Sequence, residues 1–253
     1  MILPPLQGNL STKDFFIYAA CDEKYFDEFA IPLINSIKQN SSNDIHLHIF
    51  NPRQDQLDLC SKKSISYSYE YVSLEQFKSA SIKLESTNSD EKQRTLTAMK
   101  KGSDASIQER MMKTYFACAR FIRLNQLVSN QKFFAIDIDA IVRKTLPTLA
   151  DNNLFIYRVS GNKARFLAGG IYTDNKMFLN EYAVELEKFL NQDQIYWGLD
   201  QDILENIVPK YQWSMLPYEL IDWEMKSNSF IWTAKGTRKN LSTFVNEKKK
   251  YNS

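Results

Sequence analysis

An apolar run that contains two aspartates is the strongest constraint on the fold of this chain. Residues 133–142 read Phe-Phe-Ala-Ile-Asp-Ile-Asp-Ala-Ile-Val, which predicts a buried strand. Because side chains alternate along a strand, Asp137 and Asp139 are expected to project to the same face and Ile138 to the other. Buried carboxylates are costly unless a positive charge neutralises them, so the pair indicates a divalent-cation site. The alternative is that the strand ends before the aspartates, leaving both in water.

The composition is that of a soluble enzyme and argues against a nucleic-acid binder. The 253 residues are 43% hydrophobic and 25% charged, and 32 basic against 30 acidic residues give a net charge of only +2. A dedicated nucleic-acid protein carries a larger basic excess. The C-terminal run 248–250, three lysines, allows at most a weak peripheral contact with an anionic membrane surface.

Cysteine usage and hydropathy predict a cytoplasmic protein. Cys21, Cys60 and Cys118 show no metal-ligand spacing, so buried free thiols in a reducing compartment are expected. No apolar run approaches the roughly 20 residues that a transmembrane helix needs. The first residues also lack the basic and apolar regions of a secretion signal.

Strand and helix patterns alternate along the chain, which predicts an α/β fold with a mainly parallel central sheet flanked by helices. A glycine-rich fingerprint is absent, so a dinucleotide Rossmann site and a P-loop are both disfavoured. Strands are predicted at 15–20, 45–50, 66–72, 133–142, 154–157 and 230–232, and helices at 26–39, 54–61, 107–128, 175–190 and from about 200.

We expect a single domain over residues 1–253, because no repeat or linker-like segment is present. It comprises a leader at 1–14, a polar insertion at 77–106 and a polar helical tail at 240–253. The insertion is interpreted as a surface segment with some helix, the alternative being a loop that covers a substrate.

His46 and His48 alternate along one strand, which favours a polar sheet face over a zinc site. The glycine pair at 169 and 170 indicates close approach of the backbone to a ligand or to another element.

Three motifs in order resemble the GT-A fold glycosyltransferases of family 8, the group that contains glycogenin and bacterial lipopolysaccharide galactosyl- and glucosyltransferases. The opening loop 19–22 reads Ala-Ala-Cys-Asp, residues 137–143 resemble the DxD segment of the family, and residues 200–204, Asp-Gln-Asp-Ile-Leu, resemble its DQD segment. The similarity extends over residues 15–239 apart from the polar insertion. It implies a GT-A fold.

The resemblance also implies a role for individual residues. By this resemblance, Asp137 and Asp139 are expected to bind Mn²⁺ or Mg²⁺. Asp200 and Gln201 are expected to lie beside the reacting carbon as catalytic residues. The donor-binding positions are Asp22 and Tyr25 for the nucleoside, Arg120 for the sugar and phosphates, Ile138 for the ribose, Ala168 and Gly169 for the sugar, and Gly236 and Lys239 in a C-terminal motif that meets the diphosphate.

Two positions depart from the family pattern. Leu167 stands where the family has an asparagine beside the sugar, which removes a hydrogen bond and leaves the identity of the donor open. Thr233 stands where the family has a histidine, its third metal ligand. The metal would then be held by the two aspartates, donor phosphates and water. The basic residues Lys235 and Arg238 could add positive charge.

The implied function is transfer of a sugar from a nucleotide-diphosphate sugar, a UDP-hexose, to an acceptor hydroxyl on a glycan, lipid-linked or protein acceptor, with retention of configuration. Asp200 is the candidate nucleophile of a double displacement, a front-face mechanism needs none, and a helix N-cap is a purely structural alternative for this residue. Two other functions stay open. One is a non-catalytic nucleotide-sugar or glycan-binding module, and the other is a phosphatase of the haloacid dehalogenase type.

Overall fold

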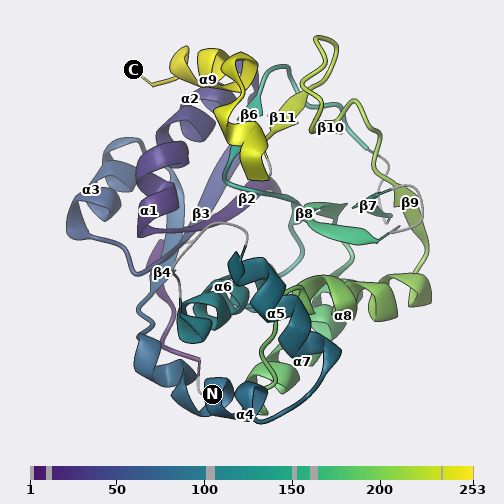
Figure 1. The fold of residues 1–253 in the computed structure, drawn as a ribbon. Helices are drawn as coiled ribbons and strands as arrows, with labels where there is room; N and C mark the ends of the chain where they lie inside the picture. The colour runs from purple at the N-terminus through teal and green to yellow at the C-terminus, as the bar shows by residue number, and fades with distance from the viewer. Residues whose placement is uncertain are drawn as a thin grey trace.

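A large mixed sheet forms the centre of the protein (Figure 1). The computed structural model describes residues 3–9, 13–100, 106–149, 153–159, 165–234 and 236–252. Over these residues the strand order is β1-β4-β3-β2-β5-β8-β7-β9. The strands are β1 (Gln7–Asn9), β2 (Phe15–Asp22), β3 (Asp44–Phe50), β4 (Ser66–Glu70), β5 (Lys132–Ile136), β7 (Leu154–Arg158), β8 (Phe166–Thr173) and β9 (Trp213–Met215).

The sheet is parallel in one half and largely antiparallel in the other. Strands β4, β3, β2 and β5 pair in parallel, whereas β8 runs antiparallel to both β5 and β7. The predicted α/β class is therefore confirmed, with antiparallel pairing added where β8 enters. β1, inside the predicted leader, pairs antiparallel with the edge strand β4.

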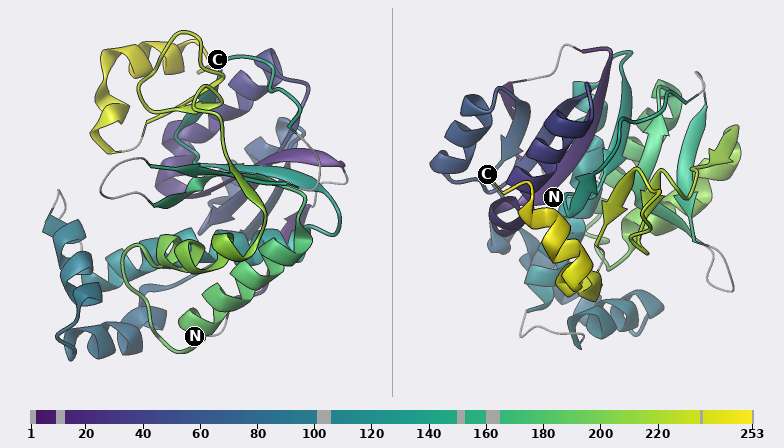
Figure 2. Two further views of the ribbon diagram at one scale, coloured as in Figure 1. Left: turned by 90° about the vertical axis from the view of Figure 1, so that its right-hand side faces the viewer. Right: turned by 90° about the horizontal axis from the view of Figure 1, so that it is seen from above.

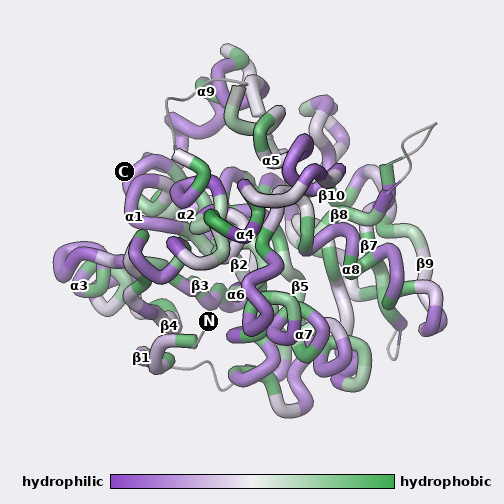
Figure 3. Tube along the Cα trace, turned by 60° about the horizontal axis from the view of Figure 1, so that its bottom comes forward, coloured by the Kyte–Doolittle hydropathy of each residue, from purple (hydrophilic) through white to green (hydrophobic). Residues whose placement is uncertain are grey.

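Helices cover both faces of the sheet, and the alternation of strand residues explains why (Figure 2). In β2, Phe16 and Tyr18 belong to the core under α6 (Ile107–Leu127), α7 (Lys176–Asn191) and α8 (Leu199–Ile207). Ile17 and Ala19 point the other way, to the core under α2 (Ile31–Asn40) and α9 (Ser242–Lys249). Figure 3 shows hydrophobic residues concentrated along the central strands.

The run around the two aspartates is not one strand, and this prediction was wrong. β5 ends at Ile136, and β6 (Ala140–Val142) belongs to a second sheet with the order β10-β11-β6. That sheet also holds β10 (Ile221–Asp222) and β11 (Ile231–Thr233). Residues 137–139 form the bend by which the chain passes from one sheet to the other. Strand alternation thus does not orient the two carboxylates.

Other elements agree with the predicted pattern except at their ends. The first helix begins earlier than expected, as α1 (Glu23–Tyr25) and a π-helical turn (Phe26–Ala30) that continue into α2. α3 (Gln54–Lys62), α6 and α7 match the predicted helices closely. The polar insertion is helical, with a 3₁₀ turn (Leu74–Phe77), α4 (Lys78–Glu85) and α5 (Asp90–Lys100), and its residues 101–105 lie outside the described part of the chain.

The two histidines of β3 are buried, which corrects the expectation of a polar sheet face. His46 bonds to the Ser66 and Ser68 hydroxyls at 3.0 and 2.9 Å, and His48 bonds to Ser68 at 2.9 Å. Burial lowers the pKa of His46 to about 4. The pair is therefore a neutral structural element inside the sheet.

All three cysteines are buried and free, as expected. Among the residues that the structure describes, no helix combines the length and the apolar character that a membrane span requires.

Candidate active site

Asp137 lies at the end of β5 and is held by two neighbours. Its Oδ1 accepts a hydrogen bond from Nη1 of Arg120, on α6, at 3.0 Å. Its carboxylate also occupies the space beside Gly169 of β8, where a Cβ on residue 169 would come within 2.3 Å of Oδ2. A glycine is thus required for the carboxylate to lie here. This is the close approach to another element that the glycine pair indicated.

One cleft of about 170 Å³ brings together six of the predicted catalytic, donor-binding and metal-binding residues. They come from four segments: the bend after β5, α6, β8 and the first turn of α8. The six are Arg120, Asp137, Ala168, Gly169, Asp200 and Gln201. Ala168 and Gly169 line the cleft from within β8.

Asp139 forms a second cluster with Lys239 and Tyr25. Lys239 lies on the 3₁₀ turn η4 (Gly236–Asn240), and its Nζ is 2.9 Å from Oδ2 of Asp139. The same ammonium donates to the Tyr25 hydroxyl at 2.6 Å and lies 4.0 Å from the centre of the Tyr25 ring. The side chain of Asp139 is only 9% exposed, so its charge is neutralised by the protein and not by water.

Burial and neighbouring charges both shift the pKa values of these groups. Burial, followed by the charge of Asp137, raises the pKa of Asp139, against the opposing effect of Lys239. Burial lowers the pKa of Lys239, but Asp139 and Tyr25 together outweigh this effect and the net shift is upward. Burial likewise lowers the pKa of Arg120, while Asp137 and Asp200 raise it above its usual value. The positive charge of Arg120 is therefore stabilised by two carboxylates, those of Asp137 and Asp200.

Asp200 and Gln201 lie in the first turn of α8. The N-cap of this helix is Gly198, with φ +90°, so Asp200 is not the cap and the purely structural alternative was wrong. Asp200 is 5% exposed, and its carbonyl accepts a hydrogen bond from the Tyr182 hydroxyl at 3.0 Å. An acidic residue in the first turn of a helix is favoured by the helix dipole.

The remaining candidate residues flank these two clusters. Asp22 ends β2, and its Oδ1 accepts from the Tyr25 backbone amide at 2.8 Å as the N-cap of α1. It lines a separate open cavity of about 630 Å³. Ile138 is buried between the two aspartates, and Gly236 opens η4 with φ +69°. Lys235 lies outside the described residues.

The oxygens at this site suit a hard divalent cation in kind, but each carboxylate already faces a cationic side chain, Asp137 facing Arg120 and Asp139 facing Lys239. Within the described part of the chain, no group of three or more His, Cys, Asp or Glu residues could hold a metal. Thr233 supplies one further oxygen, a buried hydroxyl without a hydrogen-bond partner among these residues. Mn²⁺ or Mg²⁺ would thus need phosphate and water ligands besides Asp137 and Asp139.

Sequence reasoning missed several residues that line the cleft. Trp197 and Gly198 precede α8, and Trp223 follows β10. Asp202, the second aspartate of the DQD segment, forms ion pairs with Arg94 of α5 at 2.7 Å and with Arg165 at 2.5 Å. The polar insertion therefore packs beside α8. Nothing local in the sequence marks Trp223, because its position depends on how the second sheet packs.

Replacing Gly169 with alanine is expected to displace Asp137 and to cost about 1–3 kcal/mol of stability, the usual cost of overpacking. The new Cβ and the Asp137 carboxylate cannot share the same space. Chemical denaturation measures the effect. In an Asp137→Ala background the same substitution is expected to cost almost nothing, because the clashing oxygens are gone. Equal costs in both backgrounds would refute the proposed contact.

Comparison with known proteins finds likeness at the level of structure alone. No protein-family model matches the chain, and no curated protein matches its sequence. Solved glycosyltransferases do match its fold. The glycosyltransferase GlyE of Streptococcus pneumoniae TIGR4 has a TM-score of 0.57 and 16% identity over 94% of this chain. The galactosyltransferase LgtC, solved with donor and acceptor sugar analogues, has a TM-score of 0.55 and 14% identity over 94% of it.

The matches differ in how much of the other protein they cover. The chain spans 96% of LgtC, but only 60% of GlyE and 50% of the bifunctional glycosyltransferase WbbM, which matches with a TM-score of 0.54 and 13% identity. The chain therefore has the GT-A fold of these glycosyltransferases, as the sequence motifs implied. A phosphatase of the haloacid dehalogenase type does not fit this fold.

Proposed function

We propose that this protein is a glycosyltransferase that moves a hexose from a nucleotide-diphosphate sugar, specifically a UDP-hexose, to an acceptor hydroxyl with retention of configuration. One observation carries the proposal. Arg120, Asp137, Gly169, Asp200 and Gln201 line a single cleft, although they come from segments far apart in the sequence. A fold alone does not define a function, but a cleft with these paired charges suits a diphosphate and a sugar.

The basic residues bind and orient the leaving group in this proposal. Negative charge grows on the diphosphate as the bond to the sugar breaks, so a fixed cation nearby lowers the barrier. Arg120 is held by Asp137 and is already oriented in the cleft. Lys239 is held above Tyr25, on the side of the nucleoside loop that begins at Asp22. Arg120 and Lys239 would then bind the diphosphate from two sides.

Asp200 and Gln201 would act on the sugar. Gln201 offers an amide for hydrogen bonding to sugar hydroxyls, and Asp200 is the second carboxylate that lines the cleft, beside Asp137. In a double displacement Asp200 would attack the anomeric carbon, and in a front-face reaction it would stabilise the positive charge on the sugar. The active-site glutamine that was mutated to glutamate in a solved structure of LgtC supports a role for Gln201.

A divalent cation, Mn²⁺ or Mg²⁺, is part of the proposal. Bound by Asp137 and Asp139 together with phosphate oxygens, it would supply Lewis-acid stabilisation of the leaving diphosphate. Asp139 can contribute only when Lys239 releases it, since the ammonium is 2.9 Å from its carboxylate. The diphosphate is the partner that would draw Lys239 away. Metal and nucleotide are thus expected to bind together.

A ligand screen tests the proposed donor. UDP-, GDP-, ADP- and CMP-linked sugars are added to the wild-type protein with and without Mn²⁺, and thermal unfolding is recorded. A ligand present at 100 times its dissociation constant stabilises by about 2.7 kcal/mol. We expect the largest shift with a UDP-hexose and Mn²⁺ together. No shift with any nucleotide sugar would contradict the proposal.

Replacing Lys239 with methionine is expected to have opposite effects on the two ligands. Without the ammonium, Asp139 loses the cation at 2.9 Å, so Mn²⁺ alone should bind more tightly. UDP alone should bind more weakly, because one positive charge is lost. We expect changes of about tenfold in each direction, or about 1.4 kcal/mol. Calorimetric titration of the protein with MnCl₂ and, separately, with UDP measures both.

Lys248→Met is the matched control for this substitution. Its ammonium also lies over an aromatic ring, 4.7 Å from the centre of Phe29, but its nearest acidic partner is the surface residue Glu28. Both affinities should stay as in the wild type. If Lys239→Met leaves the Mn²⁺ affinity unchanged or lower, Lys239 does not compete with the metal for Asp139.

A further inference from the structure

A larger cleft adjoins the proposed donor site. It measures about 800 Å³ and lies between β7, the segment around β10 and the start of α8. Three residues line both this cleft and the smaller one: Leu167, Gln201 and Trp223. The two cavities therefore meet beside Gln201, where the proposed function places the reacting carbon. A group held in the larger cleft would face the sugar to be transferred.

Aromatic side chains form one wall of this cleft. Tyr157 packs edge-on against Trp223, with ring centres 4.1 Å apart, and against Tyr218 at 5.7 Å. Tyr218 is 49% exposed, so much of its ring surface is available. A sugar ring has a face of C–H groups and a rim of hydroxyls. An aromatic wall with polar groups at its edge matches both features.

The charged side chains that line the cleft balance one another. The basic ones are Arg165, Lys226 and Arg238, and the acidic ones are Glu219, Asp222 and Glu224. Lys226 and Glu224 pair at 2.6 Å, and Arg165 pairs with Asp202. A cleft without net charge has no electrostatic preference for an anionic ligand. The polar and charged side chains among the lining residues favour a hydroxyl-rich ligand over an acyl chain.

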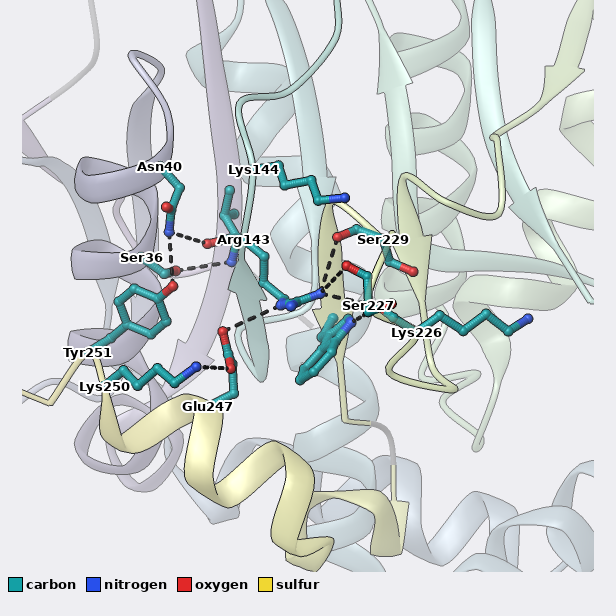
Figure 4. A network of polar contacts seen from close by, with 12 residues as sticks. Ser36, Asn40, Arg143, Lys144, Lys226, Ser227, Ser229, Glu247, Lys250 and Tyr251 are labelled. Atoms are coloured by element: carbon teal, nitrogen blue, oxygen red, sulfur yellow. Dashed lines mark hydrogen bonds and ion pairs between the residues drawn. The ribbon is translucent and has the colours of Figure 1, made fainter.

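The segment that carries Trp223 is fixed in place by two anchors. Asp222 accepts hydrogen bonds from the amides of residues 224 and 226 and from the Ser229 hydroxyl, all between 2.6 and 2.7 Å. Arg143 donates to the carbonyls of Lys226 and Ser227 at 3.2 Å, as Figure 4 shows. Its guanidinium also lies 3.8 Å from the ring centre of Trp232. The wall is thus preorganised for binding.

From this arrangement we infer that the larger cleft is the acceptor site and that the acceptor is a neutral saccharide, with a sugar ring packed on Trp223 and Tyr218. The acceptor role rests on the proposed function, because only a glycosyltransferase has an acceptor. The binding of a saccharide to the cleft can be measured whether or not the protein is a glycosyltransferase. The inferred site narrows the acceptor from glycan, lipid or protein to a neutral glycan.

Binding to an array of oligosaccharides tests the inference. The array carries neutral di- and trisaccharides of glucose, galactose and N-acetylglucosamine beside matched uronic acid sugars. The wild type is expected to bind a neutral saccharide, and Tyr218→Ala and Trp223→Ala to bind it at least tenfold more weakly. Tyr71→Ala, at an exposed tyrosine outside the cleft, should bind as the wild type does. Circular dichroism verifies that each variant is folded.

A second readout separates this inference from the proposed function. The thermal shift with a UDP-hexose and Mn²⁺ is recorded for the same proteins. A donor shift without saccharide binding, preferential binding of the acidic sugars, or full binding by Tyr218→Ala would overturn the inference while leaving the proposed function intact. Saccharide binding that needs Tyr218, in a protein without any donor shift, would support the cleft and contradict the glycosyltransferase.

Discussion

Replacing Asp139 with asparagine is expected to reduce the rate of sugar transfer about a thousandfold, which corresponds to about 4 kcal/mol of lost transition-state stabilisation. Asp139 is expected to have two roles. It holds Lys239 at 2.9 Å in the free protein, and it would hold the cation when the donor is bound. Asparagine keeps the size of the side chain but removes the charge that both roles need. Steady-state release of UDP from a UDP-hexose measures the rate.

The Mn²⁺ dependence of donor binding gives a second readout for Asp139→Asn. The thermal shift with a UDP-hexose should no longer increase when Mn²⁺ is added. Asp44→Asn is the control, because among the described residues Asp44 forms an ion pair with the exposed Lys13 alone, at 3.8 Å. A variant that keeps the full response to Mn²⁺ would contradict the assignment of Asp139 as a metal ligand.

Replacing Arg123 with methionine is expected to destabilise the protein by about 3–5 kcal/mol at pH 7, the usual cost of breaking a buried ion pair. Glu70, at the end of β4, is fully buried and accepts from Nε of Arg123 at 2.6 Å and from the Tyr115 hydroxyl at 2.8 Å. Methionine fills similar space but leaves the carboxylate without its cation. Urea denaturation measures the loss.

The pH dependence of this variant follows from the sign of the pKa shift of Glu70. Burial raises that pKa, and Arg123 opposes the shift, so its removal raises the pKa further. A carboxyl whose pKa is higher in the folded state loses stability as the pH rises above its unfolded value, about 4.3. The deficit of Arg123→Met should therefore shrink from pH 7 to pH 5. Adding Glu70→Leu should recover much of the loss, and a deficit below about 1 kcal/mol would contradict the account.

Much of the fold could be predicted because its elements have strong local patterns. α6 has the apolar spacing of an amphipathic helix over its full length, and β3 is a short apolar strand that ends at a turn, so both were placed closely. The break after Ile136 could not be predicted. Apolar residues continue on both sides of the aspartates, and only the second sheet, built from strands of two or three residues, explains why the chain bends there.

Partners at the candidate site were harder to predict than the residues themselves. The motifs singled out Asp137, Asp139 and Lys239, but not which cation faces which carboxylate. The Lys239–Asp139 pair joins residues 100 positions apart, and it depends on η4 folding back over α1. The buried carboxylate of Asp139 indicated a nearby cation, and the sequence did not show that Lys239 supplies one. Trp223 and the larger cleft gave no local signal at all.

Incubation of the wild-type protein with a UDP-hexose, Mn²⁺ and neutral oligosaccharides tests the central claim most directly. Chromatography follows UDP, and mass spectrometry follows the sugars. We predict release of UDP together with an oligosaccharide one hexose longer, and slow release of UDP and free hexose when the oligosaccharide is omitted. A donor that binds but stays intact through long incubation would contradict the claim and identify a binding module in its place.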